Sequence, residues 1–396
     1  MKNKGGSFVI VRKLTQADAR KADEVCSSAF ICSVDDEPVL EEDVTFYGAF
    51  LDDGETLFSQ IEVYNKECFY GSGILKCAGV GGVATKPEYR RRGGVRACFQ
   101  KMFDDSAESG YDISILYPFS TAYYRLFGYE TAFKSAWASY DFSVLSHIER
   151  STSVELMTEE TLDEMPDLYN RIARKQNLMF KRTDGQYFHT KPYKEKAWTY
   201  FALSPDGEKT GYVSITPNRA ENMIVVSEIG FLNKAALVTL LGFLRTFDGN
   251  YKKLVFDKLP MNSPVFDVLA DENKLAERKF YCSGSARILN LENVLKLNIY
   301  PKEKGSFILK SIDECIARNN GTFKVEYENG KAAVTKADGE KPDITLNAPA
   351  LARVLLMREG LDKEALSYID GAEINGDITD FLKAFPHLTT AFYDGF

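Results

Sequence analysis

The stretch Val83-Ala84-Thr85-Lys86-Pro87-Glu88-Tyr89-Arg90-Arg91-Arg92-Gly93-Gly94-Val95-Arg96 decides the fold of the N-terminal part of this 396-residue chain. The order of its residues predicts a strand, a short loop of arginine and glycine, and the first turn of a helix. In such a loop, small residues let the backbone approach a ligand, the N–H groups point inward, and the start of the helix adds partial positive charge. The stretch therefore predicts a pocket for a diphosphate, into which a pyrophosphate-bearing acyl carrier such as coenzyme A would fit. The alternative is a solvated basic turn before a helix, because short motifs often match by chance.

The residues on either side of this stretch predict a mixed α/β layer. Thr15 and Asp18 have the spacing of a capping box at the start of a helix. After Gly94, apolar residues recur at i, i+3, i+4, i+7 and i+8 as far as Phe103, which predicts an amphipathic helix. Strands are expected at residues 8–12, 45–51, 57–64, 75–85, 113–117 and 134–142, and a short helix at residues 121–127. The resulting order of elements is β-α-β-β-β-α-β-α-β.

Two further units follow in the sequence. A polar stretch near residues 146–153 marks a boundary, and the next unit repeats the order strand-strand-helix-strand without the arginine/glycine loop. From about residue 291 the pattern changes again: a strictly alternating run ends in Asn329-Gly330, the signature of a type I′ hairpin, and an apolar helix is expected at residues 348–357. We therefore predict an α/β protein with mixed sheets and three domains, at residues 1–146, 147–290 and 291–396.

The composition excludes several classes of protein. A net charge of -8 argues against a general nucleic-acid binder, and no apolar run approaches the length of a membrane span. The 7 cysteines are scattered without a CxxC pair, which predicts reduced thiols in a cytoplasmic protein. With 3 histidines in the whole chain, no metal site is expected.

A second motif, Tyr123-Tyr124-Arg125-Leu126-Phe127-Gly128-Tyr129, follows the first by about 30 residues. A tyrosine hydroxyl held near a thioester sulfur can protonate the departing thiolate, and Tyr124 is the candidate for this role. The alternative interpretation is aromatic packing in the core, because most of the 21 tyrosines and 27 phenylalanines must be structural.

Together the two motifs resemble those of the Gcn5-related N-acetyltransferase (GNAT) superfamily. Its loop pattern Q/R-x-x-G-x-G/A is matched by the residues from Arg90 to Val95, although Val95 is larger than the usual last residue. Its later motif is matched by the residues from Tyr123 to Tyr129. Over the whole chain, a GNAT unit, a second unit without the loop and a final domain similar to sterol carrier protein type 2 resemble the Eis (enhanced intracellular survival) acetyltransferases.

This resemblance implies a set of site residues around acetyl-CoA, the expected co-substrate. Backbone groups of the strand would pair with the pantetheine arm, and Val83 N–H would serve as an oxyanion donor. The loop would surround the pyrophosphate, with arginine side chains adding charge. The implied donor-binding residues are Val83, Ala84, Thr85, Arg91, Arg92, Gly93, Gly94, Val95, Arg96, Phe119 and Ser120.

The resemblance also implies the two catalytic groups and a homo-oligomeric, hexameric assembly. Tyr124 would be the general acid, and the terminal carboxylate on Phe396 would be the general base. An α-carboxyl has a reference pKa of about 3.3–3.7, so it is ionised at neutral pH and attracts an ammonium group. The alternative for the last residues is a mobile tail, which is usual for chain termini.

Acidic residues offer a binding site for the amine. Asp35-Asp36-Glu37 and Glu41-Glu42-Asp43 would line a pocket for a cationic amine, or else form a solvated acidic loop. Asp394, close to the proposed base, would help to position an amine. The family often has an acidic residue directly before the last one, and here that residue is Gly395, which puts aminoglycoside substrates in doubt.

From the sequence we therefore expect an N-acetyltransferase that moves acetyl from acetyl-CoA directly to a primary amine, such as a small polyamine, an aminoglycoside-like compound or a lysine. Two alternatives stay open. One is an acyltransferase with another acyl donor. The other is a non-catalytic carrier or regulator that binds CoA or a lipid, which the sterol-carrier-like domain suggests.

Overall fold

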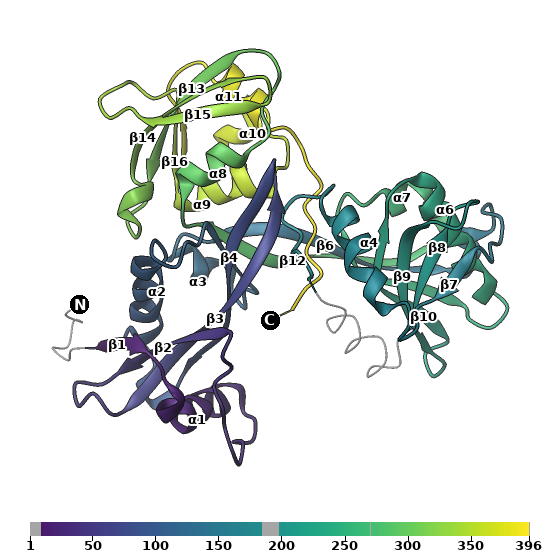
Figure 1. Cartoon of the computed structure of the whole chain (residues 1–396), viewed down its shortest axis with the longest axis horizontal. Helices are drawn as coiled ribbons and strands as arrows, with labels where there is room; N and C mark the ends of the chain where they lie inside the picture. Colours follow the sequence, from purple (N-terminus) through teal and green to yellow (C-terminus); the bar gives the residue numbers. More distant parts are fainter. Residues whose placement is uncertain (1–8, 184–197, 270, 396) are drawn as a thin grey trace. The chain divides into compact units, whose positions relative to one another are not determined.

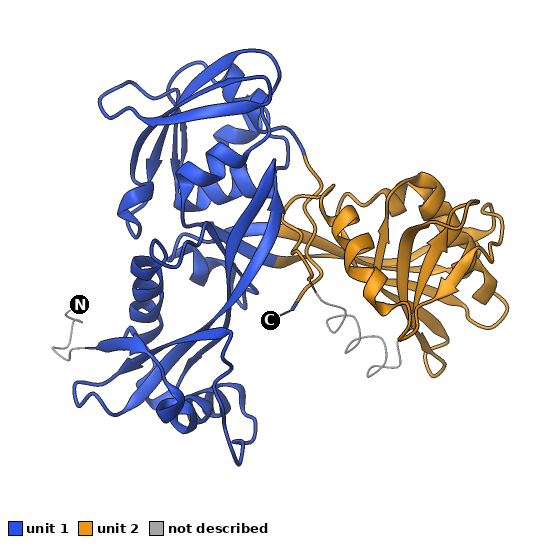
Figure 2. Cartoon of the chain, viewed as in Figure 1, with its two compact units in different colours: residues 1–132, 284–387, 395–396 blue, residues 133–283, 388–394 orange. Residues whose placement is uncertain are grey.

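A computed structural model describes residues 9–183, 198–269 and 271–395 of the chain (Figure 1). The chain divides into two compact units: residues 1–132, 284–387 and 395–396 form the first, and residues 133–283 and 388–394 form the second (Figure 2). None of the helices in the described ranges is long and apolar enough to cross a membrane. Within the same ranges, no group of three or more His, Cys, Asp or Glu residues is placed to hold a metal ion.

The N-terminal part of the first unit is a mixed sheet with the strand order β1-β2-β3-β4-β5-β12. Its strands are β1 (Ile10–Lys13), β2 (Val44–Phe50), β3 (Leu57–Tyr70), β4 (Gly73–Thr85), β5 (Ile113–Leu116) and the end of β12 (Leu275–Ile288). Neighbouring strands are antiparallel except β4 and β5, which are parallel and joined by a helix. The order of elements expected from the sequence is confirmed.

Helices cover both faces of this sheet. They are α1 (Ala19–Phe30), α2 (Gly94–Asp105) and the short α3 (Thr121–Arg125). Thr15 and Asp18 form the expected capping box ahead of α1. The neighbouring residues Ala49 and Phe50 belong to two different hydrophobic cores, one containing α2 and the other α1. Because successive side chains of a strand point to opposite faces, the two helices lie on opposite sides of the sheet.

The β3–β4 hairpin is longer than the sequence pattern predicts and its tip contacts the C-terminal domain (Figure 1). The backbone N–H of Ser72 donates to the carbonyl oxygen of Leu297 at 2.8 Å, and the hydroxyl of Tyr70 donates to the carbonyl oxygen of Leu355 at 3.3 Å. Gly71 has a φ of +52°, and a Cβ atom there would overlap the Leu297 carbonyl group. The tip therefore fits closely against the end of α8 (Leu291–Leu297).

The C-terminal domain is a five-stranded sheet with helices. Its strand order is β15-β14-β13-β16-β17, with β13 and β16 parallel. The strands are β13 (Gly305–Ile312), β14 (Gly321–Glu328), β15 (Lys331–Lys336), β16 (Ile344–Asn347) and β17 (Ala372–Ile374), and the helices besides α8 are α9 (Ala348–Leu351), α10 (Lys363–Ser367) and α11 (Thr379–Ala384). The type I′ turn is confirmed, since Asn329 and Gly330 have φ values of 54° and 82°. The helix predicted at residues 348–357 is α9 followed by a π-helix at Ala352–Met357.

The second unit repeats the layout of the first. Its strands have the order β6-β11-β10-β9-β8-β7, with β10 and β11 parallel and connected through α6, as β4 and β5 are through α2. The elements are β6 (Glu130–Asp141), β7 (Val154–Leu156), β8 (Trp198–Leu203), β9 (Lys209–Asn218), β10 (Met223–Phe231), β11 (Lys253–Pro260), α4 (Met165–Ala173), α6 (Lys234–Leu244) and α7 (Pro264–Val268). In place of the arginine/glycine loop, the Asn233 side chain caps α6 by accepting the Ala236 N–H at 2.9 Å.

The division into two units leaves the predicted domain limits untested. The first unit contains both the N-terminal sheet and most of the C-terminal domain, so the limits at 146/147 and 290/291 stay a prediction.

Candidate active site

Strand β4 separates from β5 at the point where the sequence places the donor-binding residues. The parallel register runs from Cys77 opposite Ile113 to Val80 opposite Leu116 and ends there, whereas β4 continues to Thr85. Among the described residues, no strand pairs with the last residues of β4 on the β5 side. Backbone N–H and C=O groups along an open strand edge can pair with an extended ligand.

A β-bulge shapes this separated part of β4. Glu62 pairs with Gly81 and Gln60 pairs with Ala84, so two residues of β4 oppose one residue of β3. The first of these two residues, Gly82, has a φ of +51°, and a Cβ atom there would overlap the Glu62 carboxyl group. The bulge therefore brings the carboxyl group of β3 against the backbone next to Val83.

The arginine/glycine loop leads from β4 into α2 with an open helix start. Gly93 is the N-cap with a φ of 82°, and the first helical hydrogen bond joins the N–H of Ala97 to the carbonyl oxygen of Gly93 at 3.0 Å. The N–H groups of Gly94, Val95 and Arg96 precede this bond and have no acceptor within the helix. Such N–H groups are donors suited to a phosphate.

Close packing of α2 on β3 explains the second glycine of the loop. A Cβ atom at Gly94 would lie 2.6 Å from both Phe58 Cε2 and Ser59 Cβ, closer than van der Waals contact allows. Val95 is only 9% exposed, because its side chain belongs to the core. Val95 is the position that differs from the family pattern. Its bulky side chain points into the core and therefore does not crowd the loop.

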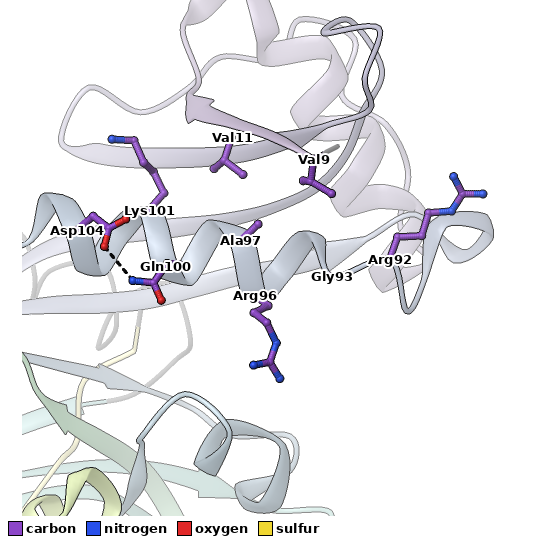
Figure 3. A pocket seen from close by; sticks show the side chains of 9 residues that line it. All are labelled: Val9, Val11, Arg92, Gly93, Arg96, Ala97, Gln100, Lys101 and Asp104. Atoms are coloured by element: carbon purple, nitrogen blue, oxygen red, sulfur yellow. Dashed lines mark hydrogen bonds between the residues drawn. The ribbon is translucent and has the colours of Figure 1, made fainter. Parts of the chain in front are cut away.

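The exposed arginines of the loop lie beside a cavity. Arg92 and Arg96, with Gly93 between them, line a cavity of about 340 Å³ that extends along α2 to Asp104 and is bounded by Val9. Figure 3 shows the Arg96 side chain pointing away from Val9, and its guanidinium lies 5.6 Å from the ring centre of Phe127. The structure thus brings together three of the predicted donor-binding residues at the start of α2.

Tyr124 lies in α3, whose N-cap is Ser120. The Ser120 hydroxyl accepts the N–H of Tyr123 at 3.3 Å, and the ring of the exposed Phe119 lies 5.4 Å from that of Tyr124. Tyr124 itself is 2% exposed and packs edge-on against Phe99. Burial raises its pKa above the usual range, so the hydroxyl keeps its proton at neutral pH. The ring is part of the core, and the catalytic role of the hydroxyl stays a prediction.

An acidic pocket of about 190 Å³ lies between α1 and strands β2 and β3. Asp35 and Glu41 come from the two acidic groups that the sequence suggests, and two further carboxylates, Asp23 and Glu62, join them. None of the described residues that line this pocket is basic. Four carboxylates without a lining cation give the pocket a negative potential that favours an ammonium group.

Side chains from β3 and α1 form the floor of this acidic pocket. The hydroxyl of Tyr64 donates to Glu62 Oε2 at 2.8 Å, and the thiol of Cys26 lies 3.6 Å from Glu62 Oε1. Gln60 is 1% exposed and donates to the Cys26 sulfur, while its own Oε1 has no hydrogen-bond partner among the described residues. Burial and the Glu62 carboxyl group raise the pKa of Cys26 to about 12, so this cysteine stays a thiol.

Sequence reasoning missed the floor of the pocket although a signal was present. Gln60, Glu62 and Tyr64 alternate with apolar residues and therefore share one face of β3. A polar face of a strand usually faces solvent, and only the packing of α1 turns this one into a pocket wall.

The two predictions at the C-terminus have different outcomes. Phe396 lies outside the described residues, so its proposed role as base is untested. The prediction that Asp394 positions an amine is wrong, because Asp394 is 3% exposed and forms an ion pair of 2.9 Å with Arg182 in the second unit.

Comparisons with known protein families agree with this architecture. Residues 11–132 and residues 178–288 each match a model described as an acetyltransferase (GNAT) domain. Residues 291–385 match a sterol carrier protein domain. The tandem arrangement and the type of the third domain, both predicted from the sequence, are thereby confirmed.

Solved structures with the same fold cover nearly the whole chain. A conserved protein from Enterococcus faecalis V583, called a probable N-acyltransferase, has a TM-score of 0.84 at 21% identity over 98% of this chain and 100% of its own. A GCN5-related N-acetyltransferase from Anabaena variabilis has a TM-score of 0.82 at 20% identity, with the same coverage. Eis1 from Mycobacterium abscessus has a TM-score of 0.79 at 19% identity, again over 98% and 100%. No curated protein matches the chain.

Proposed function

Because this chain is a GNAT acetyltransferase, with two acetyltransferase domains followed by a sterol carrier protein domain, we propose that it transfers the acetyl group of acetyl-CoA to a primary amine of a cationic substrate. GNAT domains indicate N-acetyltransferase activity with an acyl-CoA donor. The acetyl group and the cationic amine are the specific parts of this proposal.

The donor would occupy the separated edge of β4 and the open start of α2. The pantetheine arm pairs with backbone groups of Val83, Ala84 and Thr85, and Val83 N–H holds the thioester oxygen. The pyrophosphate meets the N–H groups at the helix start, with Arg91, Arg92 and Arg96 adding charge. Phe119 and Ser120 bound the other side of the arm.

One observation carries the choice of acceptor: a carboxylate that lines the acidic pocket contacts β4 where the thioester would lie. Glu62 is both a lining residue of that pocket and the group in contact with Gly82, the residue before Val83. An ammonium held by these carboxylates is thereby next to the proposed oxyanion donor. Small polyamines and lysine side chains have the charge and the slender shape that such a pocket admits.

The reaction proceeds by direct attack. The terminal carboxylate of Phe396 takes a proton from the ammonium, the nitrogen bonds to the acetyl carbon, and the C–S bond breaks. Tyr124 gives its proton to the CoA sulfur, which leaves as a thiol, and the second proton lost by the acylated nitrogen restores the Tyr124 hydroxyl. Cys26, the cysteine in the acidic pocket, keeps its proton at neutral pH and is not a suitable acyl carrier.

One cavity of the sterol-carrier-like domain is too small to hold a lipid. The cavity between Val354 and Phe385 in this domain has a volume of about 10 Å³. That volume is about the minimum that holds one water molecule, far less than a lipid needs.

Thiol release from acetyl-CoA, measured with spermidine-like polyamines, lysine peptides, aminoglycosides and neutral amines, tests the proposal. We expect turnover with cationic primary amines and a much lower rate with a long-chain acyl-CoA. Binding of acetyl-CoA without transfer to any amine would instead favour the carrier, and preference for a longer acyl chain would favour another donor.

A further inference from the structure

A buried arginine, Arg287, contacts the motif that runs from Tyr123 to Tyr129. It lies near the end of β12, which pairs with β5 in the first unit, and it is fully buried. One terminal nitrogen of its guanidinium, Nη1, donates to the carbonyl oxygen of Phe127. The other, Nη2, donates to Asp313 Oδ1 at 2.7 Å. Because a charged side chain is almost never fully buried without partners, these two contacts show what Arg287 holds in place.

The glycine of the motif makes room for this guanidinium. Gly128 has a φ of +80°, and a Cβ atom there would overlap Arg287 Nη1. On another side, the guanidinium lies 4.3 Å from the ring centre of Phe103, a core residue of α2. A side chain at position 128 would therefore push the arginine away from the carbonyl group that it binds.

The Phe127 carbonyl group belongs to the turn that ends α3 and follows Tyr124. The N–H of Phe127 donates to the Tyr124 carbonyl oxygen at 3.0 Å, and the N–H of Tyr129 donates to the same oxygen at 3.2 Å. The ring of Phe127 stacks on Phe99 with the ring centres 4.6 Å apart, and the Tyr124 ring meets Phe99 edge-on. A shift of this turn would therefore move the Tyr124 backbone and loosen the rings around its side chain.

Asp313 connects Arg287 to the sterol carrier protein domain. It follows β13, and its Oδ1 also accepts the N–H groups of Cys315 and Ile316, each at 3.0 Å. Its Oδ2 accepts a hydrogen bond from the side-chain amide of Asn319 at 3.3 Å. The side chains of Arg287 and Asp313 are only 1% and 2% exposed, and both residues belong to the first unit. The carboxylate is thus fixed by its own loop and can hold the guanidinium in one orientation.

Stability alone is a poor reason for this ion pair. Removing two charges from water costs free energy that their attraction often only balances, and replacing such a pair by apolar side chains is often neutral. The Nε atom of Arg287 also has no hydrogen-bond partner among the described residues. What the pair supplies is direction, because a planar guanidinium presents its donors in a rigid fork.

We propose that Arg287 is a positioning residue for acetyl transfer: held by Asp313, it anchors the turn after α3 so that the Tyr124 hydroxyl lies at the sulfur of the bound donor. This inference rests on the proposed function, because it acts through the proposed acid. It gives the sterol carrier protein domain a part in the reaction that needs no lipid. A proton donor must be held close to the reacting atom, and misplacement by about 1 Å can cost on the order of a hundredfold in rate.

Arg287→Lys and Asp313→Asn test this role in the full-length enzyme. The lysine keeps the charge but loses the fork, and the asparagine can still accept the N–H groups of its own loop but loses the ion pair. We expect kcat to fall by about tenfold or more, with the KM for acetyl-CoA changed less than about twofold. Hydrogen exchange of the amides of residues 127–129 should become faster in both variants.

The double variant Arg287→Met with Asp313→Asn provides the answer if a single variant fails to fold. It leaves no unpaired charge in the interior, so its thermal unfolding midpoint should lie closer to that of the unchanged protein than the midpoints of the single variants. The Phe127 carbonyl group still loses its donor, so kcat should fall as in the single variants.

Arg358→Lys is the matched control. Arg358 is another buried arginine of the C-terminal domain, and it donates to Asn298 Oδ1 at 2.6 Å and to the Pro386 carbonyl oxygen at 3.2 Å. Both of these partners lie outside the turn after α3. The substitution should therefore destabilise the same domain and leave kcat unchanged.

A Tyr124→Phe background separates positioning from a general loss of structure. Without the hydroxyl nothing is left to position, so Arg287→Lys should lower kcat no further in that background. A change that acts only by loosening the structure would lower kcat by the same factor with or without the hydroxyl.

The outcomes distinguish this inference from the proposed function. Normal kcat in the folded single and double variants, while Tyr124→Phe is impaired, would overturn the positioning role and leave the proposed function intact. An undiminished further loss in the Tyr124→Phe background, or unchanged hydrogen exchange at residues 127–129, would overturn it as well. Full activity of Tyr124→Phe would instead refute the proposed acid, and the inference with it.

Discussion

The carboxyl group of Glu62 lies against the backbone of Gly82, where any side chain would overlap it. Glu62 lines the acidic pocket, and Gly82 lies in the part of β4 that no longer pairs with β5. The proposed amine site and the proposed thioester site are therefore neighbours through a single contact. The φ of +51° at Gly82 is readily adopted by glycine, so the contact depends on the residue type as well as on the fold.

Glu62→Gln should weaken binding of the amine. Loss of one of four carboxylates is expected to raise the KM for a cationic amine about tenfold, equivalent to about 1.4 kcal/mol, with no change in the KM for acetyl-CoA. Glu42→Gln is the control, because Glu42 is exposed and does not line the pocket. Steady-state kinetics with a polyamine measure this difference. An equal KM for the polyamine in both variants would mean that the amine binds elsewhere.

Gly94→Ala should damage the donor site. The added Cβ would meet Phe58 and Ser59 at 2.6 Å, so α2 must shift from β3 and carry its N–H groups with it. We expect a loss of about 1–3 kcal/mol in stability, typical of an overpacked site, and weaker binding of acetyl-CoA in calorimetry. Gly249→Ala, at a position with open space, should change neither quantity. Unchanged affinity for acetyl-CoA in Gly94→Ala would place the donor away from this helix start.

Tyr124→Phe should lower kcat while leaving the fold intact. The hydroxyl makes no hydrogen bond to the described part of the chain, so its removal should cost little stability, whereas loss of a general acid typically lowers the rate by about 10²- to 10⁴-fold. Tyr129→Phe provides the contrast in the same cluster, because it removes a hydroxyl bonded to Ser114 at 2.7 Å. That variant should lose about 1 kcal/mol of stability and keep its kcat. The assignment fails if the two variants have equal kcat values.

Stability should depend on pH through Asp18. The carboxylate of Asp18 accepts hydrogen bonds from both terminal nitrogens of the Arg12 guanidinium, each at 2.7 Å. These bonds lower the pKa of Asp18 to about 2. An aspartate in an unfolded chain has a pKa of about 3.9, so the folded state favours the ionised form. The ion pair therefore adds about 1–2 kcal/mol to the free energy of unfolding, a value reduced by the partial exposure of Arg12. This stabilisation is complete above about pH 5 and is lost as the pH falls through 2.

The thermal unfolding of Asp18→Asn measures this contribution. Its midpoint should lie below that of the unchanged protein at pH 7, and the gap should narrow progressively from pH 5 to pH 2. A constant gap over that range would show that the Arg12 ion pair does not contribute.

Local patterns in the sequence were sufficient for the layout of the first domain. The capping box at Thr15, the apolar stripe after Gly94 and the Asn329-Gly330 turn each depend on residues close together in the chain, and all three are confirmed. Elements that depend on distant partners were not predictable in this way. The residues from Asn65 to Gly73 extend a hairpin because Leu297 and Leu355 receive its tip, and no periodicity in the hairpin indicates them.

The candidate site was predictable to a similar extent. The loop from Arg91 to Arg96 has a sequence signature, since its glycines and arginines serve one local geometry. The ion pair of Asp394 has none, because its partner Arg182 lies 212 residues away. A carboxylate near the chain end can serve a ligand or an internal cation, and only the folded chain distinguishes the two.

The fit of the β3–β4 tip against α8 has a practical consequence for chimaeras of these enzymes. The backbone of Gly71 leaves no room for a side chain beside Leu297, so a C-terminal domain transplanted from a relative must present a matching surface to this tip. An exchange of domains between such proteins must therefore carry residues 70–73 together with the domain that receives them.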